Sequence, residues 1–134
     1  MGAISTGFSQ GCLDQAVTLT KDRYLKGTSI FDSQTVPFAL ADIAMSVELC
    51  RSMYLKAAWL KDHGKDHTKE ACFAKLYASE TATKTASQVL KIFSPQSYLE
   101  ESPFARFFRQ TKLNEIVEGT SEMQRLIIAR ELLY

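Results

Sequence analysis

The fold of this chain is decided by the stretch PFALADIAMSVELCRSMYLKAAWLK, residues 37–61. Its apolar side chains recur at steps of three and four residues, which places them on one face of an α-helix, while Asp42, Ser46 and Lys56 fall on another face. The apolar face consists of Leu40, Ile43, Val47, Cys50, Tyr54 and Ala58. The stretch therefore predicts a long amphipathic helix that must bury one face against other elements.

Helical patterns with recognisable ends lie on both sides of this stretch. Gly27 ends the first pattern, Gly64 is a stop signal after the second, Asp66 or Thr68 can cap the third, and Pro103 suits the first turn of the fourth. Loops are expected at residues 94–102 and 118–120. The expected helices cover residues 3–25, 37–61, the span from the cap at 66 or 68 to 93, 103–117 and 122–133.

Side-chain type predicts how these helices pack. The third helix carries a stripe of small residues that lets another helix approach closely, formed by Ala71, Ala74, Ala78, Ala82 and Ala86. Ser121 and Gln124 have the spacing of a capping box for the last helix. The fourth helix is expected to carry Phe104, Phe107, Phe108, Leu113 and Ile116 as its apolar residues, and the last helix to turn Met123, Leu126, Ile127 and Leu133 inward.

The fold class that follows is all-α. Because no strand-like alternation or repeat interrupts the helical patterns, we expect an antiparallel, up-down-up-down four-helix bundle with an additional C-terminal helix and no sheet. With 134 residues, 46% of them hydrophobic, the chain suits a single domain over residues 1–134.

Charge and cysteine content narrow the classes of partner and compartment. The 16 basic and 15 acidic residues give a formal charge of +1 and are well mixed, so we expect no nucleic-acid partner and no membrane insertion. Cys12, Cys50 and Cys72 are far apart and odd in number, which indicates reduced core thiols rather than a disulfide framework or a zinc site. A cytoplasmic protein is expected, or one of the mitochondrial matrix in a eukaryote.

Glu118 stands at a break between two helical patterns, in IVEGTSEMQ, residues 116–124. An acid beside a glycine between helices is common, so Glu118 could be a solvated residue near the positive end of the last helix. Two features favour a functional role. Apolar Ile116 and Val117 precede it, which is one way to tune a general base, and Gly119 would let backbone amides approach a ligand closely.

Other candidate sites are weaker. His63 and His67 are four residues apart, but Gly64 interrupts the helix between them, so we expect solvated turn residues and no metal site. Trp59 and the phenylalanines have helical spacing and are expected in the core. Three basic residues make an edge that could meet a phosphate or be solvated or paired: Arg106, Arg109 and Lys112.

The run IVEGTSEMQRLIIAR, residues 116–130, resembles the C-terminal signature of acyl-CoA dehydrogenases, a glutamate-glycine-threonine-serine stretch followed by a helix. Three further stretches are similar to that family: LADIAMSVELCRSMYLKAAW, residues 40–59; KAAWLKDHGKDHTKEACFAKLYASETA, residues 56–82; and SPFARFFRQTKL, residues 102–113. Essentially the whole chain resembles the family's C-terminal helical domain.

The resemblance implies a part in the FAD-dependent α,β-dehydrogenation of an acyl-CoA thioester. Glu118 matches the carboxylate that removes the α-proton, and its backbone amide matches a donor to the thioester oxygen, so that Glu118 and Gly119 would contact the substrate. The resemblance also implies FAD contacts on one side from Thr120 and Glu122, and across a subunit boundary from Arg23 and Gln34. For the last two, a solvated helix-end arginine and a loop glutamine remain the alternatives.

The sequence departs from the family pattern around the adenosine diphosphate part of FAD. Where the family has a glutamine and a glycine-rich loop, this chain has KIFSPQSY, residues 91–98, and proline and serine cannot reproduce the close backbone approach that glycine allows. The replacements are Lys91 for the glutamine and Ser94, Pro95 and Ser97 for the glycines; Lys26 replaces an aromatic residue and Val117 a tyrosine.

Two hypotheses of different class follow. In the first, the chain supplies the catalytic C-terminal domain of an acyl-CoA dehydrogenase, and the N-terminal helical and middle β-domains of that family come from elsewhere. The chain would then work as a homo-oligomer, a dimer or tetramer, or with a complementing chain. By itself we expect it to be inactive and without FAD. In the second, it is a non-catalytic oligomerisation or interaction bundle derived from that family.

Overall fold

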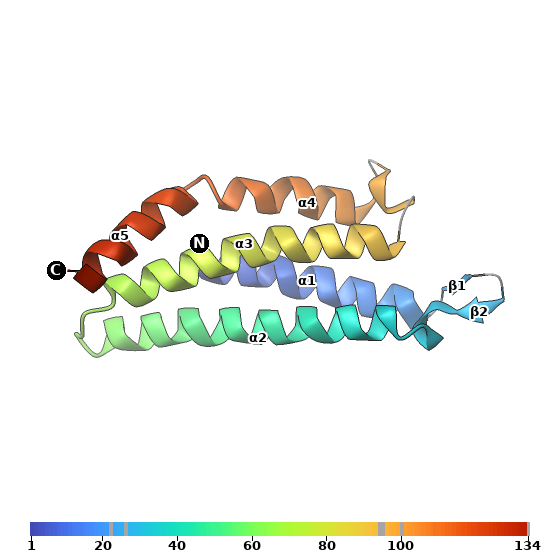
Figure 1. The fold of residues 1–134 in the computed structure, drawn as a ribbon, viewed down its shortest axis with the longest axis horizontal. Helices are drawn as coiled ribbons and strands as arrows, with labels where there is room; N and C mark the ends of the chain where they lie inside the picture. The colour runs from blue at the N-terminus through green and yellow to red at the C-terminus, as the bar shows by residue number, and fades with distance from the viewer. Residues whose placement is uncertain (22, 26, 94–95, 100, 134) are drawn as a thin grey trace.

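Five α-helices form an elongated antiparallel bundle in the computed structural model, which describes residues 1–21, 23–25, 27–93, 96–99 and 101–133 (Figure 1). The helices are α1 (Gly2–Lys21), α2 (Thr35–Asp62), α3 (Thr68–Phe93), α4 (Pro103–Asn114) and α5 (Ser121–Leu133). Helices α1 to α4 run alternately in opposite directions, and α5 bends away from the axis of α4. The predicted all-α fold, a four-helix bundle with an added C-terminal helix, is confirmed.

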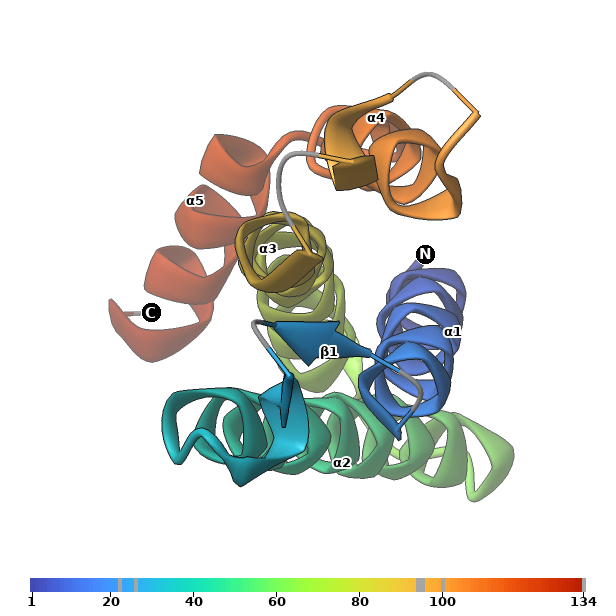
Figure 2. The same ribbon diagram turned by 90° about the vertical axis from the view of Figure 1, so that its right-hand side faces the viewer.

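Helix α3 lies at the centre of the bundle. Viewed along the bundle, it is flanked by α1, α2, α4 and α5 (Figure 2), and it contacts each of them. In contrast, α5 is in extensive contact with α3 and with no other helix among the described residues. The arrangement therefore depends on the surface of α3.

A small hairpin, absent from the sequence-based expectation, follows the first helix. Strands β1 (Tyr24–Leu25) and β2 (Thr28–Ser29) pair antiparallel, so α1 ends at Lys21 and not near residue 25. Gly27, with φ of 81°, lies between the strands, where a positive φ suits a tight turn. Two-residue strands are too short to produce an alternating pattern, which is why the sequence did not predict them.

The other helix ends agree with the sequence in part. Thr68 N donates to Asp66 Oδ1 at 3.0 Å, so the predicted cap of α3 is confirmed. The predicted capping box at Ser121 and Gln124 is wrong: Met123 N donates to Thr120 Oγ1 at 3.3 Å, which makes Thr120 the cap of α5. Helix α4 ends at Asn114 and not near 117. In the described part of the predicted loop 94–102, Gln96–Tyr98 form one short 3₁₀ turn. Ser94 and Pro95 lie outside the described residues.

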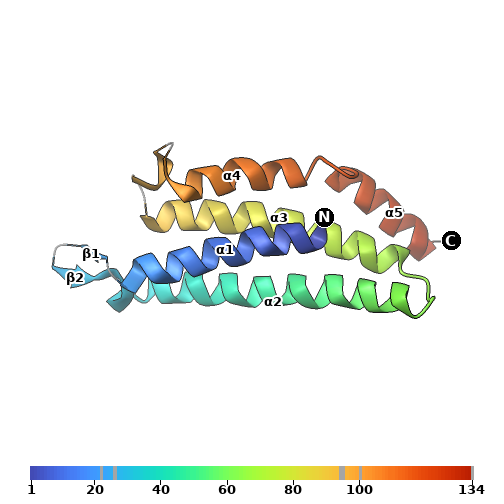
Figure 3. The same cartoon turned by 180° about the vertical axis from the view of Figure 1, so that it is seen from behind.

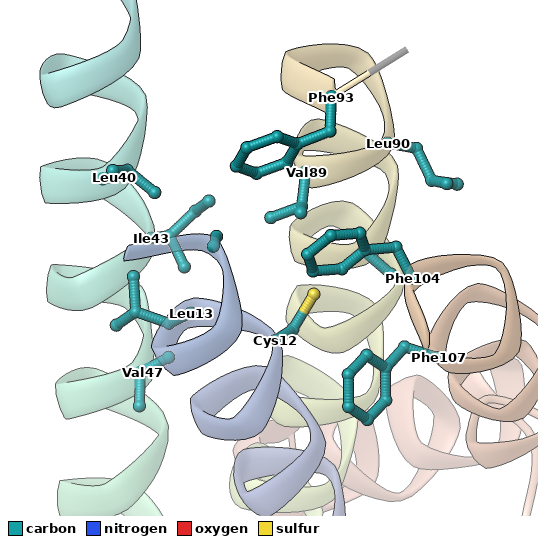
Figure 4. Close-up of a cluster of buried hydrophobic side chains, with 12 residues drawn as sticks. Cys12, Leu13, Leu40, Ile43, Val47, Val89, Leu90, Phe93, Phe104 and Phe107 are labelled. Atoms are coloured by element: carbon teal, nitrogen blue, oxygen red, sulfur yellow. The ribbon is translucent and has the colours of Figure 1, made fainter. Parts of the chain in front are cut away.

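The hydrophobic core lies between α1, α2, α3 and α4, whose side chains converge in Figure 4. The rings of Phe93 and Phe104 stack with their centroids 5.3 Å apart. Most of the predicted apolar face of α2 is buried, but Tyr54 is only half-buried, and Ala58 is exposed where its neighbour Ala57 is buried. The other large members of the core include Leu13, Leu40, Ile43, Val47, Val89, Leu90 and Phe107.

The small residues of α3 form the predicted interhelical seam. Ala74, Ala78, Ala82 and Ala86 are buried, whereas Ala71 is exposed. The close approach of α1 is measurable at Gly2, where an added Cβ would lie 3.1 Å from the carbonyl oxygen of Ala74. Larger side chains on this face of α3 would push the helices apart.

Several apolar residues expected inside are exposed. Trp59 is 49% exposed and stacks on His63, with ring centroids 4.1 Å apart, instead of lying in the core. The inward face predicted for α5 is wrong because, among the described residues, this helix packs mainly on α3 and buries Ser121 and Gln124. The exposed residues are Phe108, Leu113 and Ile116 at α4 and the turn after it, and Met123, Leu126 and Leu133 on α5; Ile127 is half-buried.

The three cysteines are free and buried, as predicted. Burial raises the pKa of the Cys12 thiol to about 12, so it is a neutral core side chain at ordinary pH. His63 is an exposed turn residue, also as predicted, and His67 is half-buried. Within the described ranges no three His, Cys, Asp or Glu side chains are grouped as metal ligands, and no helix there is long and apolar enough to cross a membrane.

Ala78→Leu is expected to lower the free energy of unfolding by about 1–3 kcal/mol, because the larger side chain overpacks the seam between α3 and its neighbours. Ala71→Leu is the matched control, because Ala71 lies on the same helix but is exposed. Alanine and leucine both favour helix, so the exchange itself changes helix propensity little. Urea unfolding followed by circular dichroism measures both. Equal stability of the two variants would contradict the packing described for α3.

Candidate active site

Glu118 lies on the turn between α4 and α5 in an unusual backbone conformation. Its φ is 56°, and Gly119 follows with φ of 89°. Glu118 is the sole non-glycine residue with positive φ among the described residues. For a residue with a Cβ, this left-handed conformation costs roughly 1–2 kcal/mol, so other contacts must hold the turn in place.

Lys75 of α3 supplies one set of these contacts. Its Nζ donates to the carbonyl oxygen of Gly119 at 2.5 Å and to that of Glu115 at 3.4 Å. The two carbonyls lie on either side of Glu118 in the sequence. Burial lowers the pKa of the Lys75 ammonium, an effect that the nearby carboxylates of Glu115, Glu122 and Glu80 oppose.

Helix α5 supplies the other set. Gln124 Nε2 lies 3.4 Å from the carbonyl oxygens of both Glu118 and Gly119. Ser121 N donates to the Glu115 carbonyl oxygen at 3.0 Å and closes the turn. The side chain of Gln124 therefore fastens the turn instead of completing the predicted capping box.

The side chain of Glu118 is exposed at an open pocket of roughly 410 Å³. Val117 is half-buried and Ile116 is 57% exposed, so the apolar surroundings expected of Glu118 are only partly provided by its own chain. The residues lining the pocket are Met1, Ala71, Cys72, Lys75, Glu118 and Gln124. The carboxylate can thus meet a ligand that approaches this face of the bundle.

Thr120, the cap of α5, and Glu122, in the first turn of that helix, lie close to Glu118 in the sequence. Hydrogen bonds from its own backbone amide and from the Thr120 hydroxyl lower the pKa of the Glu122 carboxyl. Glu122 is exposed and Thr120 half-buried. Both residues therefore follow Glu118 within four positions of the sequence, and neither is buried.

Arg23 and Gln34 lie at the hairpin end of the bundle, away from the α4–α5 turn (Figures 1 and 3). The guanidinium carbon of Arg23 lies 5.6 Å from the centroid of the Phe93 ring. Gln34 is exposed at the start of α2, and its side chain makes no capping hydrogen bond. One chain therefore does not bring these residues to Glu118. Lys26, expected to replace a cofactor-facing aromatic residue, lies outside the described residues.

The basic edge on α4 is exposed and partly paired. Lys112 Nζ lies 2.6 Å from Glu115 Oε2, while Arg106 and Arg109 are exposed. Burial acts to raise the pKa of the Glu115 carboxyl, but hydrogen bonds from Lys112 and Thr83 outweigh it and lower the pKa. This pairing is one of the two ordinary alternatives to a phosphate site.

Sequence reasoning missed Lys75. This residue is 7% exposed, the lowest value of any Lys, Arg, Asp or Glu among the described residues. Its position directly after Ala74, beside the buried alanine stripe, was the available signal, because a lysine at the edge of a packed face needs a hydrogen-bonding partner.

The fold and the turn together define a helical domain that presents a carboxylate between its last two helices. The family model described as the acyl-CoA dehydrogenase C-terminal domain matches residues 1–133. The chain belongs to the acyl-CoA dehydrogenase family and corresponds to its C-terminal domain.

Individual relatives agree with this assignment. The chain is 47% identical over 133 residues to the probable acyl-CoA dehydrogenase YngJ of Bacillus subtilis (strain 168), covering 99% of this chain and 35% of that protein. It is 43% identical over 127 residues to the mitochondrial short-chain specific acyl-CoA dehydrogenase of Bos taurus, covering 95% and 31%. The chain thus spans about a third of the length of these relatives.

Solved structures share the fold closely. Butyryl-CoA dehydrogenase from Megasphaera elsdenii superposes with a TM-score of 0.96 at 35% identity, covering 99% of this chain and 35% of that one. The glutaryl-coenzyme A dehydrogenase glutaryl-CoA complex gives 0.93 at 33% identity, covering 98% and 34%. The five-helix arrangement is therefore that of the family's C-terminal helical domain.

Glu118→Gly is expected to leave the free energy of unfolding unchanged or to raise it by up to about 1 kcal/mol, since glycine removes the cost of the positive φ but adds flexibility to the unfolded chain. Glu48→Gly is the control, because Glu48 is also exposed but lies within helix α2, where glycine costs about 1 kcal/mol. Thermal unfolding of both variants makes the comparison. Equal destabilisation would mean that Glu118 carries no backbone strain.

Proposed function

We propose that this chain supplies the general base for α,β-dehydrogenation of an acyl-CoA thioester in an FAD-dependent acyl-CoA dehydrogenase, and that Glu118 is that base. The observation that carries the proposal is the placement of this carboxylate, exposed at an open pocket, on a turn fixed in a left-handed conformation. Strained backbone at one position is typical of functional sites. The family membership of the chain and its Glu-Gly-Thr-Ser run support the same role.

Glu118 would act by accepting the α-proton of the thioester. That proton is only weakly acidic, so a positioned carboxylate and polarisation of the thioester carbonyl are both needed. The Glu118 backbone amide is the proposed donor to the thioester oxygen, and Gly119 leaves room for the substrate beside it. When bound, FAD supplies the acceptor for the hydride that leaves the β-carbon.

The residues proposed to hold FAD form two separate groups. Thr120 and Glu122 would contact the flavin beside Glu118, whereas Arg23 and Gln34, at the hairpin end, would contact the FAD of another subunit. Both groups are polar and at least partly solvent-accessible, which fits cofactor contact, but one copy cannot assemble them. A complete site would need a second copy or the remaining two-thirds of a family subunit.

Exposed apolar side chains support association with such a partner. The outer face of α2 carries five large apolar residues that its own bundle leaves uncovered: Phe38, Met45, Leu49, Leu55 and Trp59. Exposed apolar patches of this kind usually mark interfaces. We propose a homo-oligomer, a dimer or tetramer, or a complex with a chain carrying the missing domains.

A non-catalytic interaction bundle is the alternative function. It is favoured by Lys91, which stands at the end of α3 in place of the family's glutamine, together with the uncovered faces of α2 and α5. The two functions differ in whether Glu118 is needed for any reaction.

The compartment is also a proposal. Three free buried thiols suit a reducing environment, so we place the protein in the cytoplasm, or in the mitochondrial matrix of a eukaryote. Relatives from both a bacterium and mitochondria fit either location.

Glu118→Gln is expected to slow flavin reduction by acyl-CoA about 10²- to 10⁴-fold, because the amide keeps the shape of the side chain but cannot accept the proton. The measurement is anaerobic stopped-flow absorbance on the chain combined with the missing domains and FAD. Glu131→Gln, exposed at the far end of α5, is the matched control and should react at the original rate. An equally fast Glu118→Gln complex would place the base elsewhere.

The 134-residue chain by itself is expected to bind less than stoichiometric FAD, because its two groups of cofactor residues lie apart. Equilibrium dialysis against FAD, read by flavin absorbance per mole of chain, measures this. Adding the missing domains should raise the bound fraction. A yellow preparation of the chain alone with one FAD per chain would contradict the proposal.

A further inference from the structure

We propose that Lys75 is a positioning residue, whose buried side chain ties the Glu118 turn to the central helix of the bundle and keeps Glu118 in its left-handed conformation. This inference rests on the proposed function of Glu118 for its catalytic meaning, but its structural part can be tested without catalysis. It concerns a residue that contacts the turn through backbone carbonyls and not through the Glu118 carboxylate.

The burial of Lys75 requires an explanation. An ammonium group taken out of water is costly unless hydrogen bonds or opposite charges compensate it. Lys75 is 7% exposed, and in the described part of the chain none of the ion pairs includes it. Its hydrogen-bond acceptors there are the carbonyl oxygens of Glu115 and Gly119. The charge is therefore directed at the turn.

The two acceptor carbonyls, of Glu115 and Gly119, lie on either side of Glu118 in the sequence. Between them lie Ile116, Val117 and Glu118, so fixing both carbonyls limits how the backbone at Glu118 can rotate. The Gly119 carbonyl follows directly after Glu118, and at 2.5 Å its contact with Lys75 is the shorter of the two. A hydrogen bond to a charged donor is strong enough to offset the cost of the left-handed conformation.

Lys75 connects the turn to α3, a helix that does not adjoin the turn in the sequence. The turn's other backbone carbonyl contacts come from Ser121 and Gln124, which belong to α5 and move with the turn. Among the described residues, Lys75 is the side chain from outside α4 and α5 that donates to the turn's carbonyls. Helix α3 contacts every other helix, so Lys75 joins the turn to the most constrained element of the fold.

The first test uses the 134-residue chain itself. Lys75→Met keeps an unbranched apolar stem but removes the donors, and it is expected to make the Ser121 amide exchange with deuterium about 10- to 100-fold faster, since closure of the turn loses its anchor. Exchange at Val47 in the core should be unchanged. Lys84→Met, an exposed lysine on the same helix, is the matched control. Unchanged exchange at Ser121 would overturn the proposal.

The second test separates this inference from the proposed base. In the complex with the missing domains and FAD, Lys75→Met should lower the limiting rate of flavin reduction about 10²-fold with little change in acyl-CoA affinity, because displacement of a reacting group by about 1 Å has an effect of that size. If Glu118→Gln reacts at full rate while Lys75→Met still loosens the turn, the base assignment fails and the tie to α3 stands. If Glu118→Gln is slow and Lys75→Met keeps both the original rate and the original exchange, positioning by Lys75 is wrong.

A second variant guards against misfolding. Lys75→Gln retains a neutral donor on a shorter side chain, so it fills the same buried place with less loss of polarity. It should accelerate Ser121 exchange less than Lys75→Met does, while circular dichroism remains that of the original chain. If both variants are folded and their Ser121 amides exchange as slowly as in the original chain, Lys75 does not hold the turn and the proposal is wrong.

Discussion

The close packing of α3 against its neighbours is the constraint on which the rest of the structure depends. Four buried alanines, Ala74, Ala78, Ala82 and Ala86, keep this helix narrow enough to lie in the middle of the bundle. Because α3 touches all four other helices, it sets their relative positions. It also carries Lys75 and Cys72, which line the pocket of Glu118. The same helix therefore contributes to the hydrophobic core and to the candidate site.

The candidate site combines a fixed backbone with open surroundings. Glu118 is fixed in backbone conformation yet open to solvent, and the polar residues of the hairpin end lie far from it. The outer faces of α2 and α5 are apolar and uncovered. A fixed backbone beside uncovered apolar faces suits the association with further domains or copies that we propose.

The sequence predicted what depends on local pattern. The spacing within residues 37–61, the stop at Gly64 and the cap at Asp66 act within one or two helical turns, and all three are confirmed. Which apolar side chains are covered depends on distant segments, and so Met123 and Leu126 were wrongly placed inside. The positive φ of Glu118 and the burial of Lys75 arise from contacts between α3 and residues about 40 positions away, which no local pattern encodes.

The central position of α3 also determines the order in which the helices can pack during folding. During synthesis α1 and α2 emerge before α3, and the seam that buries Ala16 and Cys12 cannot close until α3 follows them. Until then the two earlier helices can only pair with each other, and their inner faces remain open to unwanted contacts. Arrival of α3 turns a loose helical pair into a cooperative unit, and α4 and α5 then dock on a surface that already exists.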